Sequence, residues 1–375
     1  MAGVRVVSVE LRDFRTYSRA EARLGDGLTV VHGPNGSGKS NLLEAIYFGC
    51  TARSPRTRND RELVRFGAPA TRVAVRLAEA AQAHELTVGF GTSGSGSPPV
   101  KRMTADGAPV ERMLDVESRP LVSVFLPDRL ELIKGPPVSR RGHLDQFVAA
   151  IWPLRAATRR EYGRVLAQRN ALLARIRSGR ASRETLHAWD RELASRALAL
   201  SADRAEATAL LTEPFARRAA DLGCGGEVKL EYRPRSRAGD EQEFCAELQE
   251  RLQSDLDRGF TGHGPHRDEL AVTRDGRELR VYGSQGEQRL ALLALLLAER
   301  AVLARERGST PLMLLDDVMS ELDAERRELL AADLAAGGQS VIATTDLSHV
   351  PGASAPTVTR LRISTGAILQ EALAA

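Results

Sequence analysis

The sequence has few cysteines, few aromatic residues and no long apolar run. Its three cysteines, Cys50, Cys224 and Cys245, are odd in number and lack the spacing of metal ligands, which argues against a disulfide framework and against zinc or redox chemistry. No stretch reaches the roughly 18 apolar residues of a membrane helix, and Met1–Leu11 is typical of a strand rather than a signal peptide. We therefore expect a soluble, cytoplasmic protein with no membrane partner.

The length of the chain suggests about two domains. Its basic residues are concentrated in the middle of the chain. The net charge of the 375 residues is +4, yet residues 138–240 hold 20 Lys or Arg against 12 Asp or Glu. Such a segment is suited to a polyanion such as DNA. A general bias towards arginine would produce the same excess, so charge alone leaves both interpretations open.

The most informative segment is a glycine-rich loop between an apolar run, Leu28–Val31, and an apolar helix expected to begin near Asn41. It has the form G-x-x-x-x-G-K-[ST], in which backbone N–H groups and the helix N-terminus surround phosphates. We expect Lys39 to contact the phosphates as a catalytic residue and the Ser40 hydroxyl to bind Mg²⁺. The predicted ATP-binding residues here are Gly33, Pro34, Asn35, Gly36, Ser37, Gly38, Lys39, Ser40 and Asn41.

A second acidic motif ends the apolar run Leu312–Leu315. Asp316 is predicted to bind the same Mg²⁺, mostly through water, and Asp317 to polarise the water that attacks the phosphate. Asp317 should point away from Asp316, because neighbouring residues of a strand face opposite sides. The alternative is that these acids only cap a helix that begins near Asp323.

The segment Tyr282–Arg289 opens a leucine-rich helix and is a second candidate anion site. Ser284 and Gly286 lie where a hydroxyl and free helix N–H groups could bind a phosphate. Alone the signal is weak, since a serine before a helix is also an ordinary cap.

The alternation of strand-like and helical segments predicts an α/β fold in two lobes. Residues 1–135 and 256–375 should form a discontinuous ATPase lobe, and residues 136–255 a mainly helical lobe. That lobe should contain a short helical hairpin, with Ser182 as N-cap of its second helix. Strands are expected at residues 4–11, 28–32, 72–77, 85–90 and 121–126, and an Asp275-Gly276 turn should join strands 269–273 and 278–282.

The order of these motifs resembles that of ABC-type ATPases: phosphate loop, Ser284-x-Gly286, Asp316-Asp317, then Ser320–Asp323. The resemblance implies a mixed-sheet ATPase head and a composite site, in which Ser284 of one subunit acts catalytically on ATP held by another. ATP would then close a homodimer that hydrolysis reopens. Thr345 stands where such proteins often carry a switch histidine, which suggests slow hydrolysis because a neutral hydroxyl is a weaker partner for phosphate.

Further segments resemble the RecF-type repair ATPases. They include Leu11–Tyr17 (L-x-N-F-R-x-Y, with Asp13 for Asn), Asn41–Ile46, Arg53–Thr57, Glu62–Gly67, Phe125–Pro137 leading into Arg140-Arg141, and Gly264–Asp268 (G-P-H-R-D). The resemblance implies a weak regulatory ATPase that binds gapped DNA at junctions between single and double strands. It also implies action with RecR and RecO in directing RecA loading during DNA repair and replication.

Two other functions are possible, a transporter ATPase subunit or another SMC-like repair ATPase. The transporter subunit predicts a Leu-Ser-Gly-Gly-Gln signature, and an SMC-like tether predicts long coiled-coil arms; neither is present. Several other residues have a purely structural interpretation. Arg140 and Arg141 could pair with Asp145 along one helix, and Tyr162 and Trp189 should pack in the hairpin core. His263 and His266 lack companion metal ligands.

Overall fold

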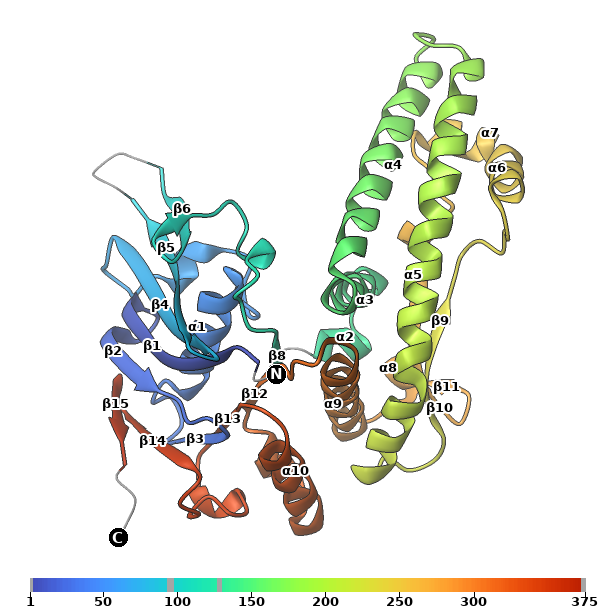
Figure 1. Cartoon of the computed structure of the whole chain (residues 1–375). Helices are drawn as coiled ribbons and strands as arrows, with labels where there is room; N and C mark the ends of the chain where they lie inside the picture. Colours follow the sequence, from blue (N-terminus) through green and yellow to red (C-terminus); the bar gives the residue numbers. More distant parts are fainter. Residues whose placement is uncertain (1–2, 93–97, 127–129, 372–375) are drawn as a thin grey trace. The chain divides into compact units, whose positions relative to one another are not determined.

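The computed structural model describes residues 3–92, 98–126 and 130–371, and its internal contacts define two compact units (Figure 1). The first unit comprises Met1–Arg129 and Leu303–Ala375, and the second comprises Leu130–Val302. The second unit is larger than expected, since residues 256–302 belong to it. The reason lies in strand pairing, because β10 (Glu269–Arg274) pairs with β9 (Val228–Arg233).

The nucleotide-loop sheet of the first unit has the order β15-β14-β3-β13-β12-β8. Adjacent strands are parallel except at the β14–β15 edge, so the carboxyl ends of β3, β12 and β13 lie along one edge of the sheet. The strands are β3 (Leu28–His32), β8 (Val122–Phe125), β12 (Leu312–Asp316), β13 (Ser340–Thr344), β14 (Thr359–Ser364) and β15 (Ala367–Gln370). A helix, α10 (Ala324–Ala336), precedes β13.

A second, antiparallel sheet has the order β2-β1-β4-β5-β6-β7. Its core side chains and those of the first sheet form one cluster with helix α1 (Lys39–Thr51). Gly49 lets α1 approach the sheet closely, because a Cβ there would lie 2.3 Å from the Val75 side chain. The strands are β1 (Arg5–Phe14), β2 (Tyr17–Arg23), β4 (Ala70–Glu79), β5 (Gln82–Gly91), β6 (Val100–Ala105) and β7 (Ala108–Pro109).

The second unit is mainly helical, with a small antiparallel sheet in the order β11-β10-β9. Its helices are α2 (Glu131–Lys134), α3 (Pro137–Ile151), α4 (Ala156–Arg177), α5 (Leu186–Asp221), α6 (Glu241–Glu250), α7 (Leu252–Arg258), α8 (Leu279–Tyr282) and α9 (Gln285–Arg307), the last of which continues beyond Val302. Strand β11 spans only Arg277–Glu278.

The predicted helical hairpin is formed by α4 and α5 (Figure 1). Its second arm runs from Leu186 to Asp221 and is longer than expected for a short hairpin, because apolar residues continue at helical spacing. Ser182 caps a short 3₁₀ turn that leads into α5, accepting a bond from the Glu184 N–H. The strand expected over residues 278–282 is wrong, since Leu279–Tyr282 forms a helical turn anchored by the buried Leu279.

Within the described residues, every helix is either too short or too polar to cross a membrane. Pro127–Arg129, part of one family-like block, lies outside the residues that the structure describes.

Candidate nucleotide-binding site

The loop Gly33–Ser40 connects β3 to α1, as the sequence predicts, and α1 begins at Lys39. All three glycines of the loop adopt backbone angles that other residues avoid: φ is 150° at Gly33, 77° at Gly36 and 116° at Gly38. At Gly33 a Cβ would lie 2.3 Å from the Ile363 carbonyl oxygen. The Tyr17 hydroxyl donates to the Gly38 carbonyl at 2.9 Å. The glycines are thus required for the loop to pass this close to neighbouring strands.

The Lys39 side chain folds back onto the start of the phosphate loop. Its Nζ donates to the carbonyl oxygens of Gly33 at 2.7 Å and Pro34 at 3.0 Å. Burial lowers the Lys39 pKa, and the nearby carboxylates of Asp316 and Asp317 oppose that shift. A buried ammonium with only carbonyl partners gains from a nearby anion, so Lys39 is suited to a phosphate.

Asp316 ends β12 beside Ser40, although the two residues are distant in the sequence. Asp316 is 8 % exposed, and burial raises its pKa while the neighbouring Ser40 hydroxyl opposes the shift. Sheet order explains the contact, because only β13 separates β12 from β3. A hydroxyl and a carboxylate side by side are oxygen ligands of the kind Mg²⁺ prefers.

Asp317 leaves the strand in a left-handed conformation, with φ 49°. Its N–H donates to the Ala343 carbonyl at 3.0 Å, which fixes the backbone at the carboxyl edge of the sheet. Among the described residues, its buried Oδ1 has no hydrogen-bond partner. The buried Ser37 hydroxyl likewise lacks a described partner. Both groups therefore fit a site that binds a polar ligand and an ordered water.

Sequence reasoning missed the fully buried carboxylate of Glu44 on α1. It accepts hydrogen bonds from Arg15 Nε at 2.9 Å, Arg15 Nη2 at 2.8 Å and the Ser54 hydroxyl at 2.6 Å. Arg56 Nη1 lies 3.3 Å from the same carboxylate. The sequence did carry a signal for this network: Glu44 lies among apolar residues of a helix, and its partners Arg15 and Arg56 lie in two of the segments that resemble the RecF-type ATPases. This network joins the β1–β2 turn and the loop after α1 to the nucleotide helix.

Asn41, predicted to bind ATP, makes its side-chain bonds within the protein. Its Nδ2 donates to the Thr16 hydroxyl at 3.1 Å, and its Oδ1 accepts from Arg56 at 3.1 Å. Its observed contacts therefore position α1.

Ser284 and Gly286 lie at the exposed N-terminus of α9, within the second unit. Ser284 does cap the helix: its hydroxyl accepts from the Glu287 N–H at 3.3 Å, and Glu287 Oε2 accepts from the Ser284 N–H at 2.8 Å. The nearby side chains of Val281 and Tyr282 are 62 % and 66 % exposed. The cap leaves this helix end accessible, so a structural cap and a phosphate contact are compatible here.

Thr345 follows the end of β13 and is exposed, whereas the preceding Thr344 is buried and donates to the Asp346 carbonyl at 2.9 Å. Because Asp316 pairs with Ala343 in the sheet, Thr345 emerges at the same edge as the nucleotide residues. The resemblance to ABC-type ATPases implies a switch residue at this edge, and the role of Thr345 there stays a prediction.

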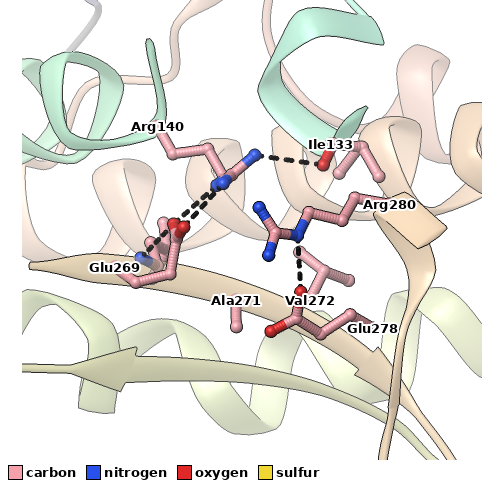
Figure 2. Close-up of a pocket in the computed structure, with 8 residues that line it drawn as sticks. Ile133, Arg140, Glu269, Ala271, Val272, Glu278 and Arg280 are labelled. Carbon is pink, nitrogen blue, oxygen red and sulfur yellow. Dashed lines mark hydrogen bonds and ion pairs between the residues drawn. The ribbon is translucent and has the colours of Figure 1, made fainter. Parts of the chain in front are cut away.

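The pairing with Asp145 that helical spacing allowed for Arg140 does not form. Arg140 instead makes two bonds of 2.7 Å to Glu269 on β10 and donates to the carbonyls of Ile133 and Gly135, as Figure 2 shows in part. Asp145 binds Arg204 of α5 at 2.8 Å. Packing between elements outweighs helical spacing here because these groups are buried and need strong partners.

His263 and His266, in and just before the Gly264–Asp268 turn, are structural. His263 Nε2 lies 2.5 Å from Glu247, and His266 Nδ1 lies 2.6 Å from the buried Tyr162 hydroxyl. Across the described residues, no cluster of His, Cys, Asp or Glu suits a metal. Tyr162 lies in the hairpin core, and Trp189 packs against it, as predicted.

Comparison with known proteins agrees with this geometry. The profile of the RecF/RecN/SMC N-terminal domain matches residues 5–360. The DNA replication and repair protein RecF of Streptomyces avermitilis is 36 % identical over 386 residues, covering 97 % of this chain and 99 % of that protein. Its counterpart in Myxococcus xanthus is 37 % identical over 367 residues, covering 94 % and 93 %.

A solved structure described as the recombination mediator protein RecF with ATP in the RecFOR pathway matches with a TM-score of 0.84 and 27 % identity, covering 99 % of this chain and 98 % of that one. An SMC head matches with a TM-score of 0.58 at 16 % identity, which supports the fold alone. The expected ABC-type ATPase fold is confirmed.

Proposed function

The chain belongs to the RecF family of DNA replication and repair proteins, and we propose that ATP joins two copies of it on DNA. ATP would be held by Gly33–Ser40 of one subunit and covered by Ser284 of the other. The observation that carries this proposal is the meeting of Lys39, Ser40 and Asp316 at one edge of the sheet. The exposed N-terminus of α9 supplies the surface for a second subunit.

The residues of the phosphate loop have distinct roles in this proposal. Lys39 exchanges its carbonyl partners for phosphate oxygens, and the loop N–H groups donate to the same anion. Ser40 and Asp316 would hold Mg²⁺, which neutralises phosphate charge. Asp317 accepts a hydrogen bond from the attacking water and orients it.

The second subunit completes the site. The Ser284 hydroxyl and the free N–H groups of α9 donate to the terminal phosphate, and Val281 and Tyr282 lose their exposure in the interface. Loss of that phosphate removes the shared contact, so hydrolysis releases the dimer. Thr345 offers no positive charge to the phosphate, and hydrolysis is therefore slow, which makes ATP a timer.

The dimer would bind DNA through arginine contacts to phosphates, preferring gaps and junctions, and would act with RecR and RecO in directing RecA loading. Family membership and the structural likeness to a recombination mediator support this part of the proposal. Binding through phosphates should weaken steeply with salt and show little sequence preference.

Gel filtration with light scattering tests the dimer directly. The wild-type chain should double in mass with ATP and Mg²⁺, and gapped DNA should co-elute. Ser284→Arg should bind a fluorescent ATP analogue within about twofold of wild type but remain monomeric, because the phosphate loop is untouched while the interface is blocked. Lys39→Met should lose nucleotide binding itself.

A chain that stays monomeric and ignores DNA in ATP would disprove the proposal. Loss of nucleotide binding in Ser284→Arg would disprove the division of the site between two subunits.

A further inference from the structure

A hollow of about 480 Å³ in the second unit is lined by three arginines and an aromatic ring. Its lining residues are Arg235, Arg258, Phe260, Gly262 and Arg267. The Phe260 side chain is 40 % exposed, and the Arg267 guanidinium lies 5.7 Å from its ring centre. The three arginines are exposed. An aromatic ring of this size is usually covered by other residues, so its exposure among cations needs an explanation.

The positive charge of the hollow is not balanced locally. Within the described parts of the chain, none of the guanidinium groups of Arg235, Arg258 and Arg267 has an ion pair or hydrogen bond. The carboxylates near these arginines in sequence already have other donors. Asp257, which precedes Arg258, accepts from Gln253 Nε2 at 2.9 Å. Asp255 accepts from Arg169 and from the Gly262 N–H, both at 2.9 Å. Asp268 accepts from Tyr232, Arg204 and the Arg235 N–H. Three cations thus surround one concavity without a counter-ion.

We infer that this hollow binds an unpaired nucleotide of single-stranded DNA. Arginine forks bind phosphate oxygens in pairs, and aromatic rings and guanidinium planes stack on bases. A free anion would use only the charges, whereas a nucleotide uses both the charges and Phe260. The inference rests on the proposed DNA-binding function and gives it a location. Because Phe260 needs an unstacked base, the hollow favours single strands over duplex.

Rigid anchoring makes the hollow a defined site rather than a loose loop. Phe260 follows α7, whose Leu256 packs with Leu173 and Leu186 of the hairpin. On the other side of Phe260, the Gly262 N–H donates to Asp255 at 2.9 Å. A backbone held in place loses less entropy on binding, which favours recognition of a single nucleotide.

Fluorescence anisotropy of the full-length chain with ATP tests the site, using a labelled oligothymidylate of about 15 nucleotides and a blunt duplex of equal length. Phe260→Ala should weaken binding of the single strand by about fivefold or more and leave the duplex nearly unchanged. Arg258→Ala should reduce the slope of log affinity against log salt by about 0.7. Phe260→Trp should retain affinity, and its added emission should be quenched by the oligonucleotide.

Arg217→Glu is the control for charge. It lies 31 residues beyond Leu186 on α5, about 45 Å along the helix, and forms only an exposed pair with Glu213. If Phe260→Ala and Arg258→Ala bind the oligonucleotide as tightly as this control, the hollow receives something else, such as an acidic protein segment, and the inference is wrong. If wild type binds neither DNA, the proposed function itself fails.

Discussion

Asp316 is the residue at which the needs of folding and of nucleotide chemistry conflict. Its carboxylate is buried at the end of β12, and burial raises its pKa. A carboxyl group whose pKa is higher in the folded state stabilises the fold below its unfolded pKa and loses that contribution as the pH rises through the folded value. At neutral pH the ionised group therefore destabilises the nucleotide-free protein.

Asp316→Asn should accordingly raise the unfolding temperature of the nucleotide-free protein by about 1–3 °C near pH 7.5, with the difference shrinking towards pH 4. The same variant should lose the Mg²⁺-dependent tightening of ATP binding. Calorimetry over this pH range and a nucleotide titration measure the two effects. Asp26→Asn, at an exposed carboxylate, should show neither. An unfolding temperature below that of wild type would contradict the argument.

Arg169 is completely buried yet charged. It donates to Asp190 at 2.7 Å, to Asp255 at 2.9 Å and to the Thr261 hydroxyl at 2.8 Å. These bonds connect α4 with α5, α7 and the turn after α7. A group of this kind specifies one arrangement of the unit, because removing one member leaves the others buried without partners.

Arg169→Ala should therefore destabilise the second unit by about 3–5 kcal/mol in urea unfolding. Arg196→Ala, which breaks only exposed pairs with Glu161 and Glu192, should cost about 1 kcal/mol or less. Equal effects of the two substitutions would show that the buried network does not hold the unit together.

At the scale of elements, the N-terminus of α9 combines a cap with a proposed ligand site. Glu287 accepts the Ser284 N–H and pairs with Arg274 on β10, and these contacts lower its pKa. These contacts stabilise the fold at pH values above the ordinary glutamate pKa of 4.5. That stabilisation is lost as the pH falls through the lower pKa of Glu287 in the folded state. The cap thus fixes the backbone on which Ser284 is presented.

Glu287→Ala should cost about 1 kcal/mol of stability at neutral pH and weaken ATP-dependent dimerisation, because Ser284 is then less well positioned. Urea unfolding and light scattering provide the two measurements. Gln285→Ala, which changes an exposed side chain beside it, should leave stability within about 0.5 kcal/mol of wild type. If Glu287→Ala is equally harmless, the cap does not order this helix end.

At the scale of the whole molecule, the first unit is discontinuous and the second is continuous. The nucleotide-loop sheet takes β3 and β8 from before the second unit and β12 to β15 from after it. Its parallel order cannot form until both ends of the chain are present, since β3 lies between β13 and β14. The second unit has its own apolar clusters and buried ion pairs.

A fragment of residues 130–307 should therefore fold alone, with helical circular dichroism and a cooperative thermal transition, and should not bind ATP. A fragment of residues 1–129 should fail to fold, because its β3 lacks both neighbouring strands. A fragment 130–307 without a cooperative transition would mean that the second unit depends on the first.

Four features follow from the sequence alone: the phosphate loop, the acidic strand end, the cap-like start of α9 and the helical hairpin. These features depend on local rules, namely glycine conformations, apolar periodicity and capping preferences, which act over a few residues. The predicted strands 4–11, 28–32, 72–77, 85–90 and 121–126 correspond to β1, β3, β4, β5 and β8.

Which distant groups meet depends on how the elements pack together. Strand order placed Asp316 against Ser40, pairing of β9 with β10 moved residues 256–302 into the second unit, and burial gave Glu44 and Arg140 their partners. The same holds for the exposed hollow around Phe260. Long-range pairing depends on packing and on the cost of burying charge, and neither is encoded in a window of neighbouring residues.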